Sequence, residues 1–251
     1  IHRMLASIFT IDEVAVVLGG PEVGAEFSAL SFDHLIFTGS TPVGRKVMKA
    51  ASDNLVPLTL ELGGKSPVII ARGHVNQRTM TSIAYGKLSN SGQTCVAPDY
   101  ALVHEDDLAE FIQQYDATVT RFYPKGPDSE DYTSIVNERH YSRLQGLLDH
   151  ARENGAQVLK MGVKPESAKD RLRTLTPTLV IGAKDDDAVM REEIFGPILP
   201  VRTYRDIDEV IDYINERDRP LALYYFGEKD AECKKLLRRT TSGNVGINNT
   251  I

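Results

Sequence analysis

Short apolar runs alternate with helical segments along this chain, and no other feature restricts its fold as strongly. The runs at residues 14–18, 35–38 and 56–61 have the length and composition of buried strands, and helical patterns fill the intervals between them. A succession of strand, helix and strand favours parallel strands joined by right-handed crossovers. The sequence therefore predicts an α/β fold with a mostly parallel sheet.

The same alternation continues to the end of the chain. Further strands are predicted at residues 68–70, 100–103, 157–159, 221–226 and 245–248, and helices at 77–89, 107–122, 138–153, 206–217 and 229–239. The polar residues 164–173 predict a surface excursion. The glycine pair at 63 and 64 is the candidate domain junction, which predicts one domain over residues 1–62 and a second over residues 63–251.

The composition argues against several classes of protein. A chain of 251 residues is longer than one typical domain of roughly 100–150 residues, and 41% hydrophobic residues are enough for a sizeable core. A net charge of −6, without a stripe of Lys or Arg, argues against a nucleic-acid partner. No apolar run approaches the roughly 18–20 residues that span a bilayer, so we expect a soluble chain without a membrane segment.

The two cysteines, Cys95 and Cys233, lie far apart in the sequence and lack the spacing of metal ligands. The six histidines show no zinc spacing either, so no metal site is expected. A disulfide framework is implausible in a chain of this size with two cysteines, and a reducing compartment, the cytoplasm, is expected.

The two ends of the chain resemble interior segments of a longer protein. The first residue is Ile1 rather than Met, within what reads as a helix, and the last residues read as a strand that enters a loop. We therefore expect a fragment of a longer protein.

Cys95 and Glu61 are the candidate catalytic pair. Cys95 follows a predicted helix and lies just behind Gly92, where a close backbone turn can expose the sulfur and direct main-chain N–H groups at an oxyanion. Glu61 ends a predicted strand at the sheet edge where open α/β folds bind ligands. A thiolate and a base together can form and release an acyl group. Taken singly, each residue is more often structural, as a buried thiol or an exposed carboxylate.

A second candidate, for phosphate binding, is the turn at residues 39–44. The turn joins a strand to a helix that continues through residues 45–51, with Ser40 or Thr41 as the N-cap and Pro42 near the first helical position. A helix N-terminus favours a phosphate. The segment is neither the dinucleotide fingerprint nor a Walker A loop, and alone it is more often an ordinary tight turn.

Glu193 and Phe195 precede a Gly-Pro turn and are candidates for nucleoside binding. A carboxylate can accept from both hydroxyls of a ribose, and an aromatic ring can pack beside a flat ring. A solvated acidic turn is the simpler alternative. Cys233 is expected to pack on a helix face, without a chemical role.

The order and spacing of these segments together resemble the aldehyde dehydrogenase superfamily. The segments are FTGS at 37–40, LELGGKSP at 60–67, GQTC at 92–95 and EEIFGP at 192–197. The stretches GQTCVAPDY at 92–100 and NERDRPLAL at 215–223 are similar to the class 3 branch, which includes coniferyl aldehyde dehydrogenases. The resemblance covers essentially the whole chain.

The resemblance implies a fold and a set of roles. Residues 1–62 would be the C-terminal half of a modified Rossmann domain for NAD or NADP, and 63–251 a three-layer α/β catalytic domain, incomplete at its C-terminal end. Cys95 would be the nucleophile, with its own N–H in the oxyanion hole, and Glu61 the general base. The cofactor would contact Gly39, Ser40, Leu62, Gly63, Glu193 and Phe195.

The implied activity is the NAD(P)-dependent oxidation of an aldehyde, possibly aromatic, to its acid through a thiohemiacetal and a thioester. The implied assembly is a homo-oligomer, with a dimer favoured. Two alternatives stay open: a dehydrogenase that passes the acyl group to coenzyme A, and an inactive fragment or binding module. Family residues that would separate NAD from NADP, and the Asn that would complete the oxyanion hole, fall outside the sequence.

Overall fold

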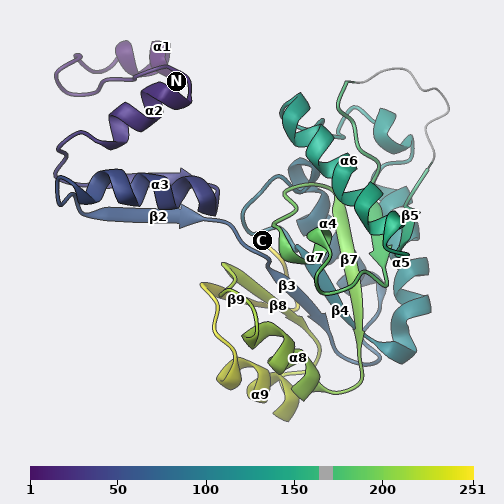
Figure 1. Cartoon of the computed structure of the whole chain (residues 1–251). Helices are drawn as coiled ribbons and strands as arrows, with labels where there is room; N and C mark the ends of the chain where they lie inside the picture. Colours follow the sequence, from purple (N-terminus) through teal and green to yellow (C-terminus); the bar gives the residue numbers. More distant parts are fainter. Residues whose placement is uncertain (164–171) are drawn as a thin grey trace. The chain divides into compact units, whose positions relative to one another are not determined.

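The computed structural model describes residues 1–163 and 172–251, which form two compact units, Ile1–Leu62 and Gly63–Ile251 (Figure 1). Most of the polar excursion predicted at residues 164–173 lies outside the described residues. No helix in the described part of the chain is long and apolar enough to cross a membrane.

The first unit is built on two parallel strands, β1 (Leu35–Gly39) and β2 (Leu58–Leu62). The helix α3 (Thr41–Ser52) connects them and packs on both, with Val47 and Ala51 buried. Its start is set by sequence, since Ser40 is the N-cap residue and Pro42 occupies the first turn. The helices α1 (His2–Ala6) and α2 (Pro21–Ser28) precede the sheet.

The predicted strand at residues 14–18 is wrong. This segment has no regular secondary structure, and Val17 and Leu18 are 59% and 76% exposed. A strand needs a partner for its backbone N–H and C=O groups. Among the described residues β1 pairs only with β2, so the apolar run finds no strand beside it.

The second unit contains a seven-stranded sheet in the order β5-β6-β7-β4-β3-β8-β9. Every neighbouring pair is parallel except β5 and β6, so the prediction of a mostly parallel sheet is confirmed. The strands are β3 (Pro67–Ile70), β4 (Tyr100–His104), β5 (Gln157–Lys160), β6 (Thr178–Ile181), β7 (Ile198–Tyr204), β8 (Ala222–Phe226) and β9 (Asn244–Ile247).

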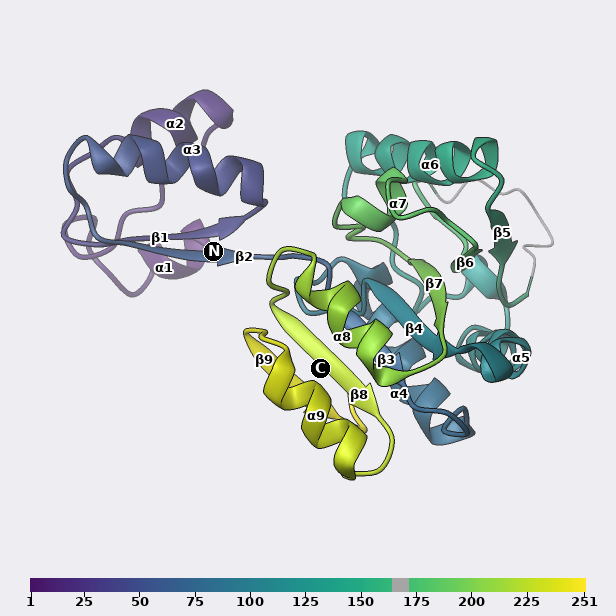
Figure 2. The ribbon, with the colours of Figure 1, turned by 60° about the horizontal axis from the view of Figure 1, so that its bottom comes forward.

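Helices cover both faces of this sheet and give three layers (Figure 2). Alternate residues of one strand enter different cores: Val68 and Ile70 pack with α4 and α5, whereas Ile69 packs with α6, α8 and α9. The helices are α4 (Gln77–Leu88), α5 (Leu108–Phe122), α6 (Glu138–Glu153), α7 (Ala188–Arg191), α8 (Ile207–Asn215) and α9 (Ala231–Arg239), with short 3-10 turns at Ser89–Gly92, Glu105–Asp107 and Gly126–Asp128.

Candidate active site

Cys95 lies at the corner of a turn between α4 and β4. The Ala97 N–H donates to the Thr94 carbonyl at 3.1 Å, which makes Cys95 and Val96 the two central residues of the turn. The Cys95 thiol is exposed and free, so the alternative of a buried hydrophobic cysteine does not apply to it. That description fits Cys233, which is 1% exposed in the core beneath α9.

The backbone that leads to this turn is left-handed over three successive residues. Asn90, Ser91 and Gly92 have φ values of 51°, 53° and 72°. A Cβ on Gly92 would lie 2.4 Å from the Gly196 carbonyl oxygen and 2.8 Å from the Lys87 carbonyl oxygen. Only glycine allows both the left-handed backbone and the close approach of these two carbonyl groups, so Gly92 determines the position of Cys95.

Side chains hold the turn from both sides of Cys95. The Gln93 amide donates to the carbonyls of Asn90 at 3.0 Å and Ser134 at 3.2 Å, and accepts from the Val136 N–H at 2.8 Å. On the other side the Tyr224 hydroxyl donates to the Val96 carbonyl at 2.6 Å. The Cys95 side chain thus lies on a turn that is fixed from both sides, and a reacting group held in this way has a lower entropic cost of attack.

The Cys95 N–H remains available on this turn. Within residues 1–163 and 172–251 no backbone or side-chain acceptor takes its hydrogen bond. A free main-chain donor next to an exposed thiol is an arrangement that can stabilise the oxyanion of a carbonyl that such a thiol attacks.

We expect Gly92→Ala to lower both stability and the reactivity of Cys95. The substitution forces a Cβ into the Gly196 carbonyl and a side chain into a left-handed conformation, at a cost of about 1–3 kcal/mol. Urea unfolding and the rate of iodoacetamide alkylation of Cys95 measure the two effects. The matched control is Gly146→Ala, inside α6 with no neighbour within 4 Å of the new Cβ. It should stabilise by up to about 1 kcal/mol. Equal behaviour of the two variants would contradict the role of Gly92.

Glu193 lies on a glycine cradle in the same unit. A Cβ on Gly63 would lie 1.9 Å from its Oε1, so the carboxylate occupies the space that a side chain there would fill. Burial raises the pKa of Glu193, and the hydrogen bond from the Gly64 N–H opposes that rise. Phe195 follows with a φ of 51° and is half-buried.

A buried ion pair fixes the segment that carries Glu193. Lys65 pairs with Asp99 and donates to the carbonyls of Val189 and Glu192, each at 3.0 Å. Asp99 in turn accepts from the Ile194 N–H at 2.9 Å. Asp99 also stands four residues after Cys95. One carboxylate therefore joins the Glu193 segment to the loop around Cys95, residues 90–97, which is called the nucleophile loop below for its proposed role.

Lys65, Asp99, Gln93 and Tyr224 were not predicted from the sequence as supporting residues. All four stand inside or beside the motif segments, so that position was a usable signal. Apart from Asn90, the partners of their side chains lie between 34 and 128 residues away in the sequence, and nothing in the local pattern identifies such contacts.

In the first unit the predicted residues meet at one end of the two-stranded sheet. The register pairs Gly39 with Leu62 and Thr38 with Glu61, so both strands carry their candidates at their carboxyl ends. Ser40 caps α3 by position, but its side chain makes no capping hydrogen bond. Among the described residues its hydroxyl and the Thr41 N–H are therefore open to an anion, whereas Pro42 has no N–H and the Val43 N–H donates to the Ser40 carbonyl at 3.0 Å.

Glu61 and Cys95 belong to different units, as do Ser40 and Glu193. Glu61 is exposed on β2, and Cys95 is exposed on its turn. Their meeting at one catalytic centre stays a prediction.

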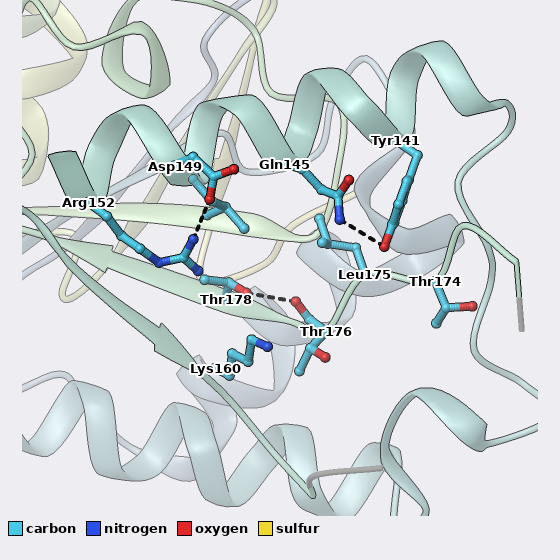
Figure 3. A pocket seen from close by; sticks show the side chains of 10 residues that line it. Tyr141, Gln145, Asp149, Arg152, Lys160, Thr174, Leu175, Thr176 and Thr178 are labelled. Carbon is cyan, nitrogen blue, oxygen red and sulfur yellow. Dashed lines mark hydrogen bonds and ion pairs between the residues drawn. The ribbon is translucent and has the colours of Figure 1, made fainter. Parts of the chain in front are cut away.

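A hollow of about 270 Å³ in the second unit contains none of the predicted residues (Figure 3). Its polar groups are largely engaged with one another: Arg152 pairs with Asp149 at 2.6 Å, and Gln145 donates to the Tyr141 hydroxyl at 3.1 Å. Within the described residues, no group of three or more His, Cys, Asp or Glu could hold a metal ion.

Comparison with known proteins gives matches over nearly the whole chain. The model of the aldehyde dehydrogenase family matches residues 11–251. A probable coniferyl aldehyde dehydrogenase of Caulobacter vibrioides is 49% identical over 100% of the chain and 52% of its own length. A coniferyl aldehyde dehydrogenase of a Pseudomonas species is 47% identical over 99% of the chain and 52% of its own length.

The solved structures agree with the sequence matches. The substrate-bound AldH of Staphylococcus aureus superposes with a TM-score of 0.90 at 40% identity, over 100% of this chain and 53% of that one. The chain thus spans about half the length of the relatives it matches.

Proposed function

Because the chain belongs to the aldehyde dehydrogenase family, as its motifs predicted, we propose that it takes part in the NAD(P)-dependent oxidation of an aldehyde to a carboxylic acid. The observation that carries this proposal is the exposed Cys95 thiol on an anchored turn with an open main-chain N–H. A nucleophile in that setting is suited to attack a carbonyl carbon.

The chemistry proceeds on Cys95 in two halves. The Cys95 thiol loses its proton to water, its sulfur bonds to the aldehyde carbon as the carbonyl π bond opens, and the Cys95 N–H stabilises the resulting oxyanion of the thiohemiacetal. When bound, NAD or NADP supplies the nicotinamide that accepts the hydride, which leaves a thioester on Cys95. Glu61 then takes a proton from water, the water oxygen attacks the thioester carbon, and the acid leaves as the thiol is restored.

The residues present fit a dinucleotide. The Ser40 hydroxyl and the Thr41 N–H at the start of α3 suit the pyrophosphate, with Gly39 and Leu62 beside them at the ends of β1 and β2. The Glu193 carboxylate on Gly63 suits the hydroxyls of the nicotinamide ribose, and Phe195 would flank the ring. On this assignment residues 1–62 are the C-terminal half of the cofactor domain, and 63–251 belong to the catalytic domain.

For the substrate we propose an aromatic aldehyde of the coniferyl type, supported by the names of relatives that are 47% to 50% identical. Glu61 favours water over coenzyme A as the acyl acceptor. We also propose a homo-oligomer, with a dimer favoured, and a reducing, cytoplasmic setting, which suits a free nucleophilic thiol.

The test is an assay of aldehyde oxidation by the natural protein, that is, the protein as its own gene expresses it. With coniferyl aldehyde we expect reduction of NAD or NADP without added coenzyme A. A strict requirement for coenzyme A would favour the acylating alternative. Absence of any reduction across aliphatic and aromatic aldehydes would favour a module that keeps the fold without turnover. The same assay on the 251-residue chain separates the activity of this part from that of the natural protein.

A further inference from the structure

Lys87 is a fully buried lysine whose ammonium has no hydrogen-bond partner in the part of the chain that the structure describes. It stands in the last turn of α4 and is 0% exposed. Within the described residues its Nζ meets no acceptor. Burying a cation without hydrogen bonds costs several kcal/mol, so an isolated ammonium is not expected in a core without a compensating charge.

The position of Lys87 places it between the two functional segments of this unit. A Cβ on Gly92 would lie 2.8 Å from the Lys87 carbonyl oxygen and 2.4 Å from that of Gly196. The end of α4 therefore packs against both the nucleophile loop and the segment that follows Glu193.

The charged groups that act on Lys87 come from three segments outside its own helix. They are Asp99 before β4, Lys65 before β3 and Glu193 after α7. Lys65 and Asp99 are already paired, and Asp99 holds the Ile194 N–H. Lys87 adds a second ammonium group to this set, and the Arg143 guanidinium from α6 also acts on Glu193. The C-terminal end of α4 adds partial negative charge that also favours a cation.

We propose that Lys87 is a positioning residue: its buried ammonium balances Asp99 and Glu193 and thereby fixes the Glu193 carboxylate beside the nucleophile loop. The inference rests on the proposed function, in which Glu193 holds the nicotinamide ribose. Without the ammonium, only Lys65 and the Arg143 guanidinium are left to oppose the repulsion between Glu193 and Asp99, so that repulsion is less fully offset.

This arrangement depends on pH. Burial lowers the pKa of Lys87 to about 8, although Asp99 and Glu193 act in the opposite direction. The ammonium is present below pH about 8 and is lost as the pH rises through that value. The hold on the cofactor should weaken over the same interval.

The experiment measures the dissociation constant of the cofactor in the natural protein below and above pH about 8. We expect Lys87→Met to weaken binding at the lower pH by about tenfold or more and to lack the alkaline weakening of the wild type. Lys87→Arg keeps a charge that does not titrate, so it should bind well at both pH values. Lys234→Met, an exposed lysine on α9, is the control and should match the wild type.

A purely structural role predicts a different pattern. Lys87→Met would then lower the urea midpoint while cofactor affinity and its pH profile stay those of the wild type, and that result would overturn the proposal. If Lys87→Met does not fold, Lys87→Arg decides, because persistence of the alkaline weakening in that variant also overturns it.

Failure of the proposed function gives another signature. If the natural protein binds neither NAD nor NADP, the assignment of Glu193 to a ribose falls. The pH dependence of the stability to urea then still tests whether the buried Lys87 carries a proton. The folded state loses this proton near pH 8, whereas an unfolded lysine keeps it up to the ordinary value of 10.5, so the folded state gains stability as the pH rises between them. The urea midpoint of the wild type should rise relative to Lys87→Met over that interval, and a constant difference would contradict a buried ammonium.

Discussion

We expect Cys95→Ala to abolish aldehyde oxidation in the natural protein, with a loss of at least about 10⁴-fold in kcat. Covalent catalysis has no substitute when the attacking atom is removed, and losses of this order are typical of missing nucleophiles. The variant should also lose the first-turnover burst of NADH or NADPH, because hydride departs only from the thiohemiacetal on Cys95. Rapid mixing of enzyme, cofactor and coniferyl aldehyde measures both quantities.

Cys233→Ala is the matched control for the lost thiol. Cys233 is the other free cysteine, and it lies on the buried face of α9 rather than at the surface. Its replacement should lower the urea midpoint through a small cavity and leave the burst amplitude unchanged. A Cys95→Ala variant that still produces a burst would remove Cys95 from the mechanism.

The regular part of the fold was predictable because its elements are locally consistent. The helix α6 begins and ends where its apolar spacing and the Asn137 cap indicate, and β8 is a continuous apolar run buried on both faces. Such elements need no knowledge of their partners. The exposure of Cys95 was likewise consistent with Gly92, whose left-handed backbone sets the turn.

The elements that failed depend on distant neighbours. Residues 14–18 have the composition of a strand but no strand beside them among the described residues. The strand β7 was not predicted, and it contains Pro200, which normally argues against a central strand. Proline has no backbone N–H to donate to a neighbouring strand. Pro200 is tolerated because the pairing of β7 with β4 begins only at Val201, whereas on the other side Pro200 lies opposite Val180 of β6.

The same distinction between local pattern and distant contacts applies to the candidate site. Cys95, Glu61 and Glu193 have residue types that suggest a chemical role. The groups that support Cys95 and Glu193 include an amide, a tyrosine hydroxyl, a lysine and a carboxylate, which have no distinctive pattern in the sequence. The pair of Lys65 and Asp99, and the buried Lys87, become meaningful only when the sheet brings their segments together. Support by charge balance is a property of the folded state, and a linear pattern does not contain it.

Glu61→Gln separates the two halves of the reaction and should slow steady-state turnover by about 10²–10⁴-fold. Gln keeps the shape of Glu but accepts no proton from water, so the thioester on Cys95 forms and then persists. The first-turnover burst should survive with its full amplitude, followed by a slow phase limited by hydrolysis.

The control is Glu26→Gln, at an exposed glutamate on α2 of the same unit, which should leave both phases unchanged. Because Glu61 and Cys95 lie in different units, this variant tests whether the two meet. A Glu61→Gln protein with the wild-type steady-state rate would assign the base to another residue, and one without a burst would place Glu61 in the attack by Cys95 as well.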